Sequence, residues 1–139
     1  MSIARESIES ELKGTVIPWL RAAGYKGSFP HFRRPDDAGI DLLTFQFDRH
    51  GDGFVVEIAR CPLNGLTTHW GKHVAPSKVT AWDMQPNDRT RLKPRSGSGT
   101  ESWFRYENGQ FKQCAMELLK ILRDNKQVSR VEQDVVPSA

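Results

Sequence analysis

Residues 39–61 contain two stretches of alternating apolar side chains, joined by the polar turn 48–53, Asp-Arg-His-Gly-Asp-Gly. A period of two is typical of a strand with one buried face, and a short Gly- and Asp-rich turn between two such stretches predicts a β-hairpin. The residues expected to face the core are Leu43, Phe45, Phe47, Phe54, Val56 and Ile58. The opposite faces are mixed in polarity, so we expect them to be only partly covered.

Two further segments have the periodicity of amphipathic helices. Apolar residues recur at three- and four-residue spacing over residues 3–23 and again over residues 109–124. In the first helix, Pro18 is expected to kink or split the helix, because proline has no N–H to donate to the carbonyl of Gly14. Gly24 should then end it in a left-handed conformation, with an aromatic residue following.

The remaining strands are harder to place. Residues 28–34 predict an edge strand, because Pro30 cannot lie in the centre of a sheet. Residues 102–106, Ser-Trp-Phe-Arg-Tyr, predict another strand. The segment 62–101 is rich in turn residues, and we expect at least one short strand in it, over 78–82 or 89–92. Its Ser- and Gly-rich end, residues 95–100, is expected to be a flexible tip.

These elements predict a single α+β domain over residues 1–126. Its antiparallel sheet has about four to five strands, and the N- and C-terminal helices pack on one face of the sheet. Residues 127–139 are expected to be an extended or flexible C-terminal tail. A chain of 139 residues is of the usual size for one domain.

The composition favours a cytoplasmic protein. No apolar run approaches the length of a membrane span, and the N-terminus carries acidic residues instead of an apolar signal segment. Cys61 and Cys114 are expected to be reduced and packed in such a compartment. The net charge is +3, and its excess lies in the middle of the chain, where residues 61–105 hold seven Lys or Arg against three Asp or Glu.

The sequence lacks the patterns that usually carry cofactor or nucleotide chemistry. It contains no G-x-x-x-x-G-K-[ST] loop and no G-x-G-x-x-G turn, so no cofactor is expected. No catalytic residue is assigned, because no serine or cysteine lies in a recognisable nucleophile motif. A non-enzymatic protein is therefore favoured.

A metal site is a minor alternative. His69 and His73 stand four residues apart, a spacing at which two histidines share a face of a helix and can bind zinc. Cys61 lies eight residues before the first of them and is the third candidate ligand. Against this, Gly71 lies between the two histidines in a loop-like segment. A small hydrolase or metal site using His69 and His73 with a cysteine remains open.

Aromatic and basic residues interleave through the middle of the chain. Tryptophan and arginine anchor protein interfaces, and they also form the stacking platforms that bind single-stranded nucleic acid. The leading hypothesis is a protein-binding module, an immunity-like or regulatory partner of another bacterial protein. The alternative is a nucleic-acid-binding domain. The candidate contact residues are Trp70, Trp82, Arg89, Arg91, Trp103 and Arg105.

The order of several motifs resembles the bacterial domain of unknown function 4304 family. The similarity covers roughly residues 8–124. It begins with the Leu-Arg-Ala-Ala-Gly-Tyr-Lys step at 20–26 and continues through Phe-Arg-Arg at 32–34, Leu-Thr-Phe-Gln at 43–46 and Phe-Val-Val-Glu-Ile at 54–58. Arg89, Arg91-Leu92 and Trp103-Phe104 complete it. The resemblance implies a small α+β domain with an antiparallel sheet and flanking helices. It implies no activity and no catalytic residues.

Overall fold

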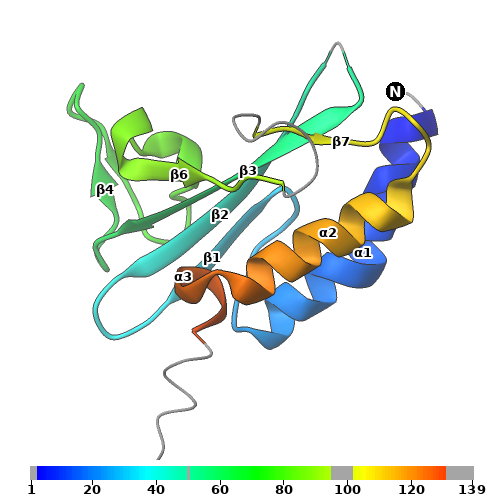
Figure 1. The fold of residues 1–139 in the computed structure, drawn as a ribbon. Helices are drawn as coiled ribbons and strands as arrows, with labels where there is room; N and C mark the ends of the chain where they lie inside the picture. Colours follow the sequence, from blue (N-terminus) through cyan, green and yellow to red (C-terminus); the bar gives the residue numbers. More distant parts are fainter. Residues whose placement is uncertain (1–2, 50, 95–101, 131–139) are drawn as a thin grey trace, which may run out of the picture.

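The computed structural model describes residues 3–49, 51–94 and 102–130. They form an antiparallel five-stranded sheet with helices against one of its faces (Figure 1). Helix α1 (Ile3–Ala22) opens the chain, and helices α2 (Phe111–Asp124) and α3 (Lys126–Ser129) follow the sheet. The predicted α+β single domain is confirmed.

The sheet is built around the predicted hairpin. Its two strands pair in register from Ile40 opposite Cys61 to Phe47 opposite Phe54. The five strands are β1 (His31–Pro35), β2 (Ile40–Phe47), β3 (Gly53–Cys61), β6 (Arg89–Arg91) and β7 (Phe104–Arg105). The hairpin is β2 and β3, and β1 pairs with the free side of β2. Strands β6 and β7 both pair with the free side of β3, at different positions along it.

The main core lies between the sheet and helices α1 and α2. The apolar stripe of α1 is buried there, as are Phe45 and Phe54 of the hairpin, while Phe47 is partly buried at the edge of this core. Pro18 does not split α1, which continues to Ala22. The apolar stripe on both sides of Pro18 keeps its packing, and this offsets the loss of one backbone hydrogen bond. Gly24 has a φ of 101°, as expected for the residue that ends the helix.

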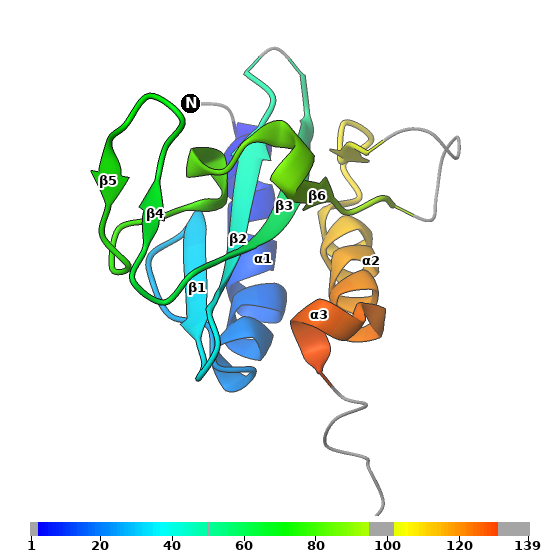
Figure 2. The ribbon, with the colours of Figure 1, turned by 90° about the vertical axis from the view of Figure 1, so that its left-hand side faces the viewer.

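A second layer covers the other face of the sheet (Figure 2). It consists of the small ladder of β4 (Leu66–Thr67) and β5 (His73–Val74) and the short 3-10 helices η1 (Ala81–Asp83) and η2 (Pro86–Asp88). Of the two strands considered in this part of the sequence, residues 89–91 form a strand, β6 of the main sheet, whereas residues 81–83 form η1 in the covering layer. The outer hairpin face is therefore more completely buried than its mixed polarity indicates. Its second core contains Ile40, Leu42, Ala59, Cys61, Val79, Ala81 and Met84.

The packed structure extends past residue 126. Helix α3 contains Val128, whose side chain is fully buried, and Asn125 caps it by accepting a hydrogen bond from the Val128 N–H. Residues 127–130 therefore contact the domain. Residues 131–139 of the predicted tail and the predicted tip at 95–100 lie outside the described residues. No helix in the described part of the chain is long and apolar enough to span a membrane.

Candidate functional site

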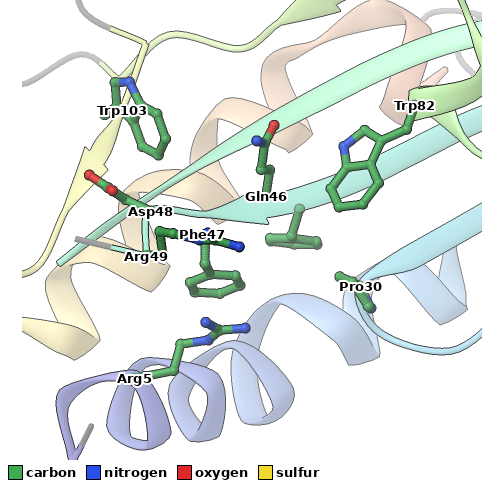
Figure 3. Close-up of a pocket in the computed structure, with 9 residues that line it drawn as sticks. Arg5, Pro30, Gln46, Phe47, Asp48, Arg49, Trp82 and Trp103 are labelled. Carbon is green, nitrogen blue, oxygen red and sulfur yellow. The ribbon is translucent and has the colours of Figure 1, made fainter. Parts of the chain in front are cut away.

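Two of the predicted contact residues, Trp82 and Trp103, line the same pocket (Figure 3). The pocket has a volume of about 510 Å³ and lies at the hairpin end of β2. Trp82 comes from η1 in the covering layer, and Trp103 directly precedes β7. The residues between the two indoles come from α1, from the turn before β1, from the end of β2 and from the hairpin turn that follows it. They are Arg5, Pro30, Phe45, Gln46, Phe47, Asp48 and Arg49.

The ring of Trp82 is held in place by a histidine. Its indole is edge-on to the His31 imidazole, with ring centroids 5.0 Å apart, and 46% of the Trp82 residue surface remains exposed. On its other side, His31 Nδ1 is 3.1 Å from the Thr44 hydroxyl, on the neighbouring strand. This fixes the edge of the pocket, because Thr44 is fully buried in the sheet.

The contact between His31 and Trp82 gives stability a pH dependence. Burial lowers the pKa of His31, the Arg33 guanidinium lowers it further and Asp83 opposes them. Between the folded and unfolded pKa values the unfolded chain binds more protons, so the free energy of unfolding should fall as the pH drops below about 6.5. Urea titrations from about pH 8 to about pH 5 should show a steeper decrease for the wild type than for His31→Gln. Equal pH dependence of the two proteins would contradict this.

The Trp103 side of the pocket is organised by an arginine. The Arg105 guanidinium lies 5.3 Å from the centre of the Trp103 ring, and its Nη1 is 3.5 Å from Oδ2 of Asp48. Arg105 thus connects β7 to the hairpin turn. Its predicted contact role is compatible with this position, although Arg105 itself is not among the pocket residues.

At the α1 side of the pocket, a cation lies over an aromatic ring. The guanidinium of Arg5 is 3.8 Å from the centre of the Phe47 ring, and its Nε donates to Glu9 at 2.6 Å. Arg49 adds a second basic residue, with an exposed side chain. A cation above a ring and two indoles form a surface suited to planar or apolar groups with some negative charge.

Arg89 and Arg91 do not lie with the two tryptophans. Arg89 Nη1 donates to Glu57 Oε1 at 2.8 Å, and Arg91 Nε donates to Oε2 at 2.9 Å. The Glu57 residue is 4% exposed, so the two guanidinium groups neutralise a buried carboxylate of β3. Their first role is to hold β6 against β3, and this lowers the charge they offer to nucleic acid.

A second ion cluster lies at the opposite end of the hairpin. Asp41, which is fully buried, accepts hydrogen bonds from Arg34, Arg60 and Arg130. Asp36 joins the cluster, and its hydrogen bonds from Arg60 hold the pKa of its carboxyl well below the ordinary value. The cluster links β1, β2, β3 and the end of α3, so its positions indicate a structural role.

The predicted metal ligands do not converge. His69 lies on the β4–β5 loop and His73 begins β5, with Gly71, whose φ is 92°, between them, so the two histidines do not share a helix. His73 Nδ1 is 3.2 Å from the Thr67 hydroxyl, and His69 packs edge-on against Trp70. Across residues 3–49, 51–94 and 102–130, no three His, Cys, Asp or Glu side chains are grouped to hold a metal ion. Trp70 is exposed at this loop, away from the pocket residues.

Both cysteines are buried and not disulfide-bonded. Cys61 belongs to the second core, and Cys114 belongs to the main core. Burial raises the pKa of the Cys114 thiol to about 12, and burial also raises the pKa of Cys61. Neither thiol has the lowered pKa that activates a nucleophile.

Several pocket residues had no signal in the sequence. Gln46 and Phe47 belong to a predicted strand, and Arg5 belongs to a predicted helix that is distant from this strand in the sequence. They share one site because β1 begins only at His31, which leaves the end of β2 without a neighbouring strand on that side. The strand expected over residues 28–34 starts only at His31, because Pro30 lies in the turn before it.

The comparisons with known proteins identify a family. The domain of unknown function DUF4304 matches residues 16–136, which is most of the chain. No curated protein and no solved structure matches it. The order of helix, hairpin and closing helix that carried the resemblance is present in the structure. The chain therefore belongs to the DUF4304 family, whose function is not known.

Proposed function

We propose that this protein is a binding module that recognises a partner protein through the pocket between Trp82 and Trp103. The observation that carries the proposal is the convergence of two indoles from distant segments on one pocket beside basic side chains. Tryptophan and arginine are the residues most enriched among interface hot spots. An indole that is 46% exposed leaves apolar area that a partner can cover.

The pocket also has a fixed geometry, which favours recognition over incidental exposure. His31 supports Trp82, and Arg105 lies beside Trp103 while also contacting Asp48. A preorganised indole loses little conformational entropy when a partner binds. Both indoles are therefore suited to act as anchors.

Truncation of one indole tests this function. Affinity capture from the host lysate should retain a protein on the wild type that the Trp82→Ala variant binds at least about 30-fold more weakly, the loss expected of a hot spot. Trp70→Ala is the matched control, because Trp70 is 65% exposed but does not line the pocket. It should bind like the wild type.

Two results would count against the proposal. Equal capture by Trp82→Ala and wild type would exclude the pocket as the binding site. Recovery of nucleic acid alone, lost between about 50 mM and 200 mM salt, would favour the basic-surface alternative, because phosphate contacts weaken steeply with salt. A thermal unfolding curve for each variant checks that the fold is retained.

A further inference from the structure

The pocket follows the edge of a strand instead of one of its faces. Residues 45–49 line it consecutively. Phe45, Gln46 and Phe47 end β2, and Asp48 and Arg49 begin the hairpin turn. Successive side chains of a strand point to opposite faces of the sheet, so three consecutive strand residues can border one pocket only where the pocket runs along the strand's edge. Figure 3 shows the arrangement, with Gln46 directed to the side of the two indoles and Phe47 directed toward Arg5.

This edge of β2 is uncovered because β1 begins only at His31. The first β1 residue, His31, pairs with Thr44, while β2 continues to Phe47. The Phe45 N–H donates to the carbonyl of Pro30 at 3.0 Å, which is the final bond across this edge. Pro30 has no N–H to return to the Phe45 carbonyl.

The alternation of the ladder identifies the next backbone groups along the edge. The Asp48 N–H donates to the Gly53 carbonyl at 2.9 Å. The even-numbered residues of this segment therefore direct their backbone N–H and C=O groups toward β3. Phe47 therefore directs its N–H and C=O away from β3, like Phe45. Among the described residues no backbone group bonds to the Phe47 N–H, and Ser28, which the β1 register would place opposite, accepts from His31 instead.

We propose that the partner supplies an extended acidic segment that adds as a strand to the free edge, which begins at the Phe45 carbonyl, includes Phe47 at the end of β2 and continues to Arg49 in the hairpin turn. The inference rests on the proposed function and specifies how the pocket binds. Strand addition gives affinity through backbone hydrogen bonds and specificity through pockets for alternate side chains. On the face that carries Gln46, one partner side chain enters between Trp82 and Trp103.

The charges along the edge favour an acidic segment. Arg49 borders the pocket with an exposed side chain, Arg5 borders it while also paired with Glu9, and Asp48 is the one acidic residue among those that line it. Asp48 itself already lies near Arg105. A partner strand with Asp or Glu beside an apolar or aromatic residue complements this combination of basic groups and indoles, and lysine-rich strands are disfavoured.

The test uses displayed random ten-residue peptides as the probe. Selection on the wild-type protein should enrich peptides with Asp or Glu and an aromatic or branched apolar residue at alternating positions. Synthetic copies of the enriched peptide should protect the Phe47 amide from hydrogen exchange at least about tenfold at saturation. Methylating a single backbone nitrogen of the peptide should weaken binding at least about tenfold at every second residue, whose N–H faces the edge of β2. Methylation at the residues between them should leave binding unchanged.

A charge reversal provides the matched variant. Arg49→Glu should weaken the peptide at least about fivefold, whereas Lys112→Glu, on the exposed surface of α2, should leave affinity unchanged. Both substitutions change the net charge equally, so the comparison isolates the position of the charge.

The outcomes separate the inference from the proposed function. Peptides whose binding depends on Trp82 but leaves Phe47 exchange unchanged would overturn strand addition and leave the pocket as the binding site. Enrichment of no peptide, together with equal protein capture by Trp82→Ala, would overturn both. Phe47 protection that rises with protein concentration in the absence of peptide would show that a second copy occupies the edge. If the Phe47 amide were protected without peptide and removal of residues 131–139 abolished this protection, the edge would be occupied by this chain's own acidic tail.

Discussion

Replacing Asp41 with alanine is expected to lower the free energy of unfolding by about 3–5 kcal/mol. The side chain is fully buried at the start of β2, and three guanidinium groups donate to it. Arg34 Nη2 is 2.8 Å from Oδ2, Arg60 Nη1 is 2.7 Å from Oδ1, and Arg130 Nη2 is 2.6 Å from Oδ2. Removing the carboxylate would leave buried positive charge without its counter-ion, which costs more than the ion pair itself contributes.

The effect is expected to be large because Arg34 is nearly inaccessible to water. It is 8% exposed, and its remaining donors bond to backbone carbonyls of Ala23, Gln127 and Val128. The guanidinium therefore joins the end of α1 to α3, and water cannot easily replace the lost carboxylate. Loss of Asp41 should loosen α3 along with the start of β2.

Urea unfolding of two variants and a control measures this. Asp41→Asn keeps the shape but offers one oxygen in place of two, so it should still lose about 2 kcal/mol or more. Asp37→Ala removes an exposed carboxylate from the adjacent turn and should change stability by no more than about 0.5 kcal/mol. An Asp41→Ala protein within about 1 kcal/mol of wild type would show that the cluster is dispensable.

The sequence predicted the elements whose signals are local. The hairpin was predictable because its alternation and its turn lie within one stretch, and the register from Ile40–Cys61 to Phe47–Phe54 confirms it. Helices α1 and α2 were predictable from apolar periodicity. In the sequence, Asp41 is only a polar residue near the start of an otherwise apolar strand, and its partner Arg130 is 89 residues away. Such long-range pairings leave no mark on local periodicity.

The covering layer shows the same limit. Residues 62–94 have the composition of turns, yet they bury Val79, Ala81 and Met84 on the outer face of the sheet. Because this burial involves single residues in irregular backbone, no period of two or 3.6 reveals it. Glu57 is a similar case, since its arginine partners lie in a strand 32 and 34 residues away.

The candidate site was only partly predictable, for a geometric reason. Trp82 and Trp103 were identified by residue type alone, because tryptophan is common in interfaces. The same criterion also selected Trp70, Arg89 and Arg91, which the structure places elsewhere. Residue type cannot tell which segments meet at the uncovered end of β2. That information depends on where β1 begins.

Phe54→Ala should destabilise the protein by about 3–5 kcal/mol, the range for removing a buried aromatic side chain. Phe54 is fully buried at the start of β3. Its ring stacks on Phe104 at 5.3 Å with an interplanar angle of 11°, and Phe47 lies 5.3 Å away on the paired strand. Truncation would leave a cavity that the rigid sheet cannot fill completely.

The site gives this substitution a consequence beyond stability. Among the described residues, strand β7 pairs with β3 at two positions, Gly53 with Arg105 and Phe54 with Phe104, and one further backbone bond runs from the Tyr106 N–H to the Asp52 carbonyl. So short a ladder contributes little by itself, and the aromatic stack is the main attachment of β7, next to Trp103. Phe54→Leu, which keeps much of the volume, should fold with a smaller loss yet weaken partner binding.

Urea unfolding and a surface truncation separate these effects. Met116→Ala shortens a side chain that is 47% exposed on α2 and should change stability by no more than about 0.5 kcal/mol. If Phe54→Ala cost less than about 1.5 kcal/mol, the site would have collapsed around the missing ring and the stack would not be a main attachment. If Phe54→Leu bound the partner like wild type, Trp103 would owe its position to Arg105 and Asp48, because these are its other connections to the hairpin.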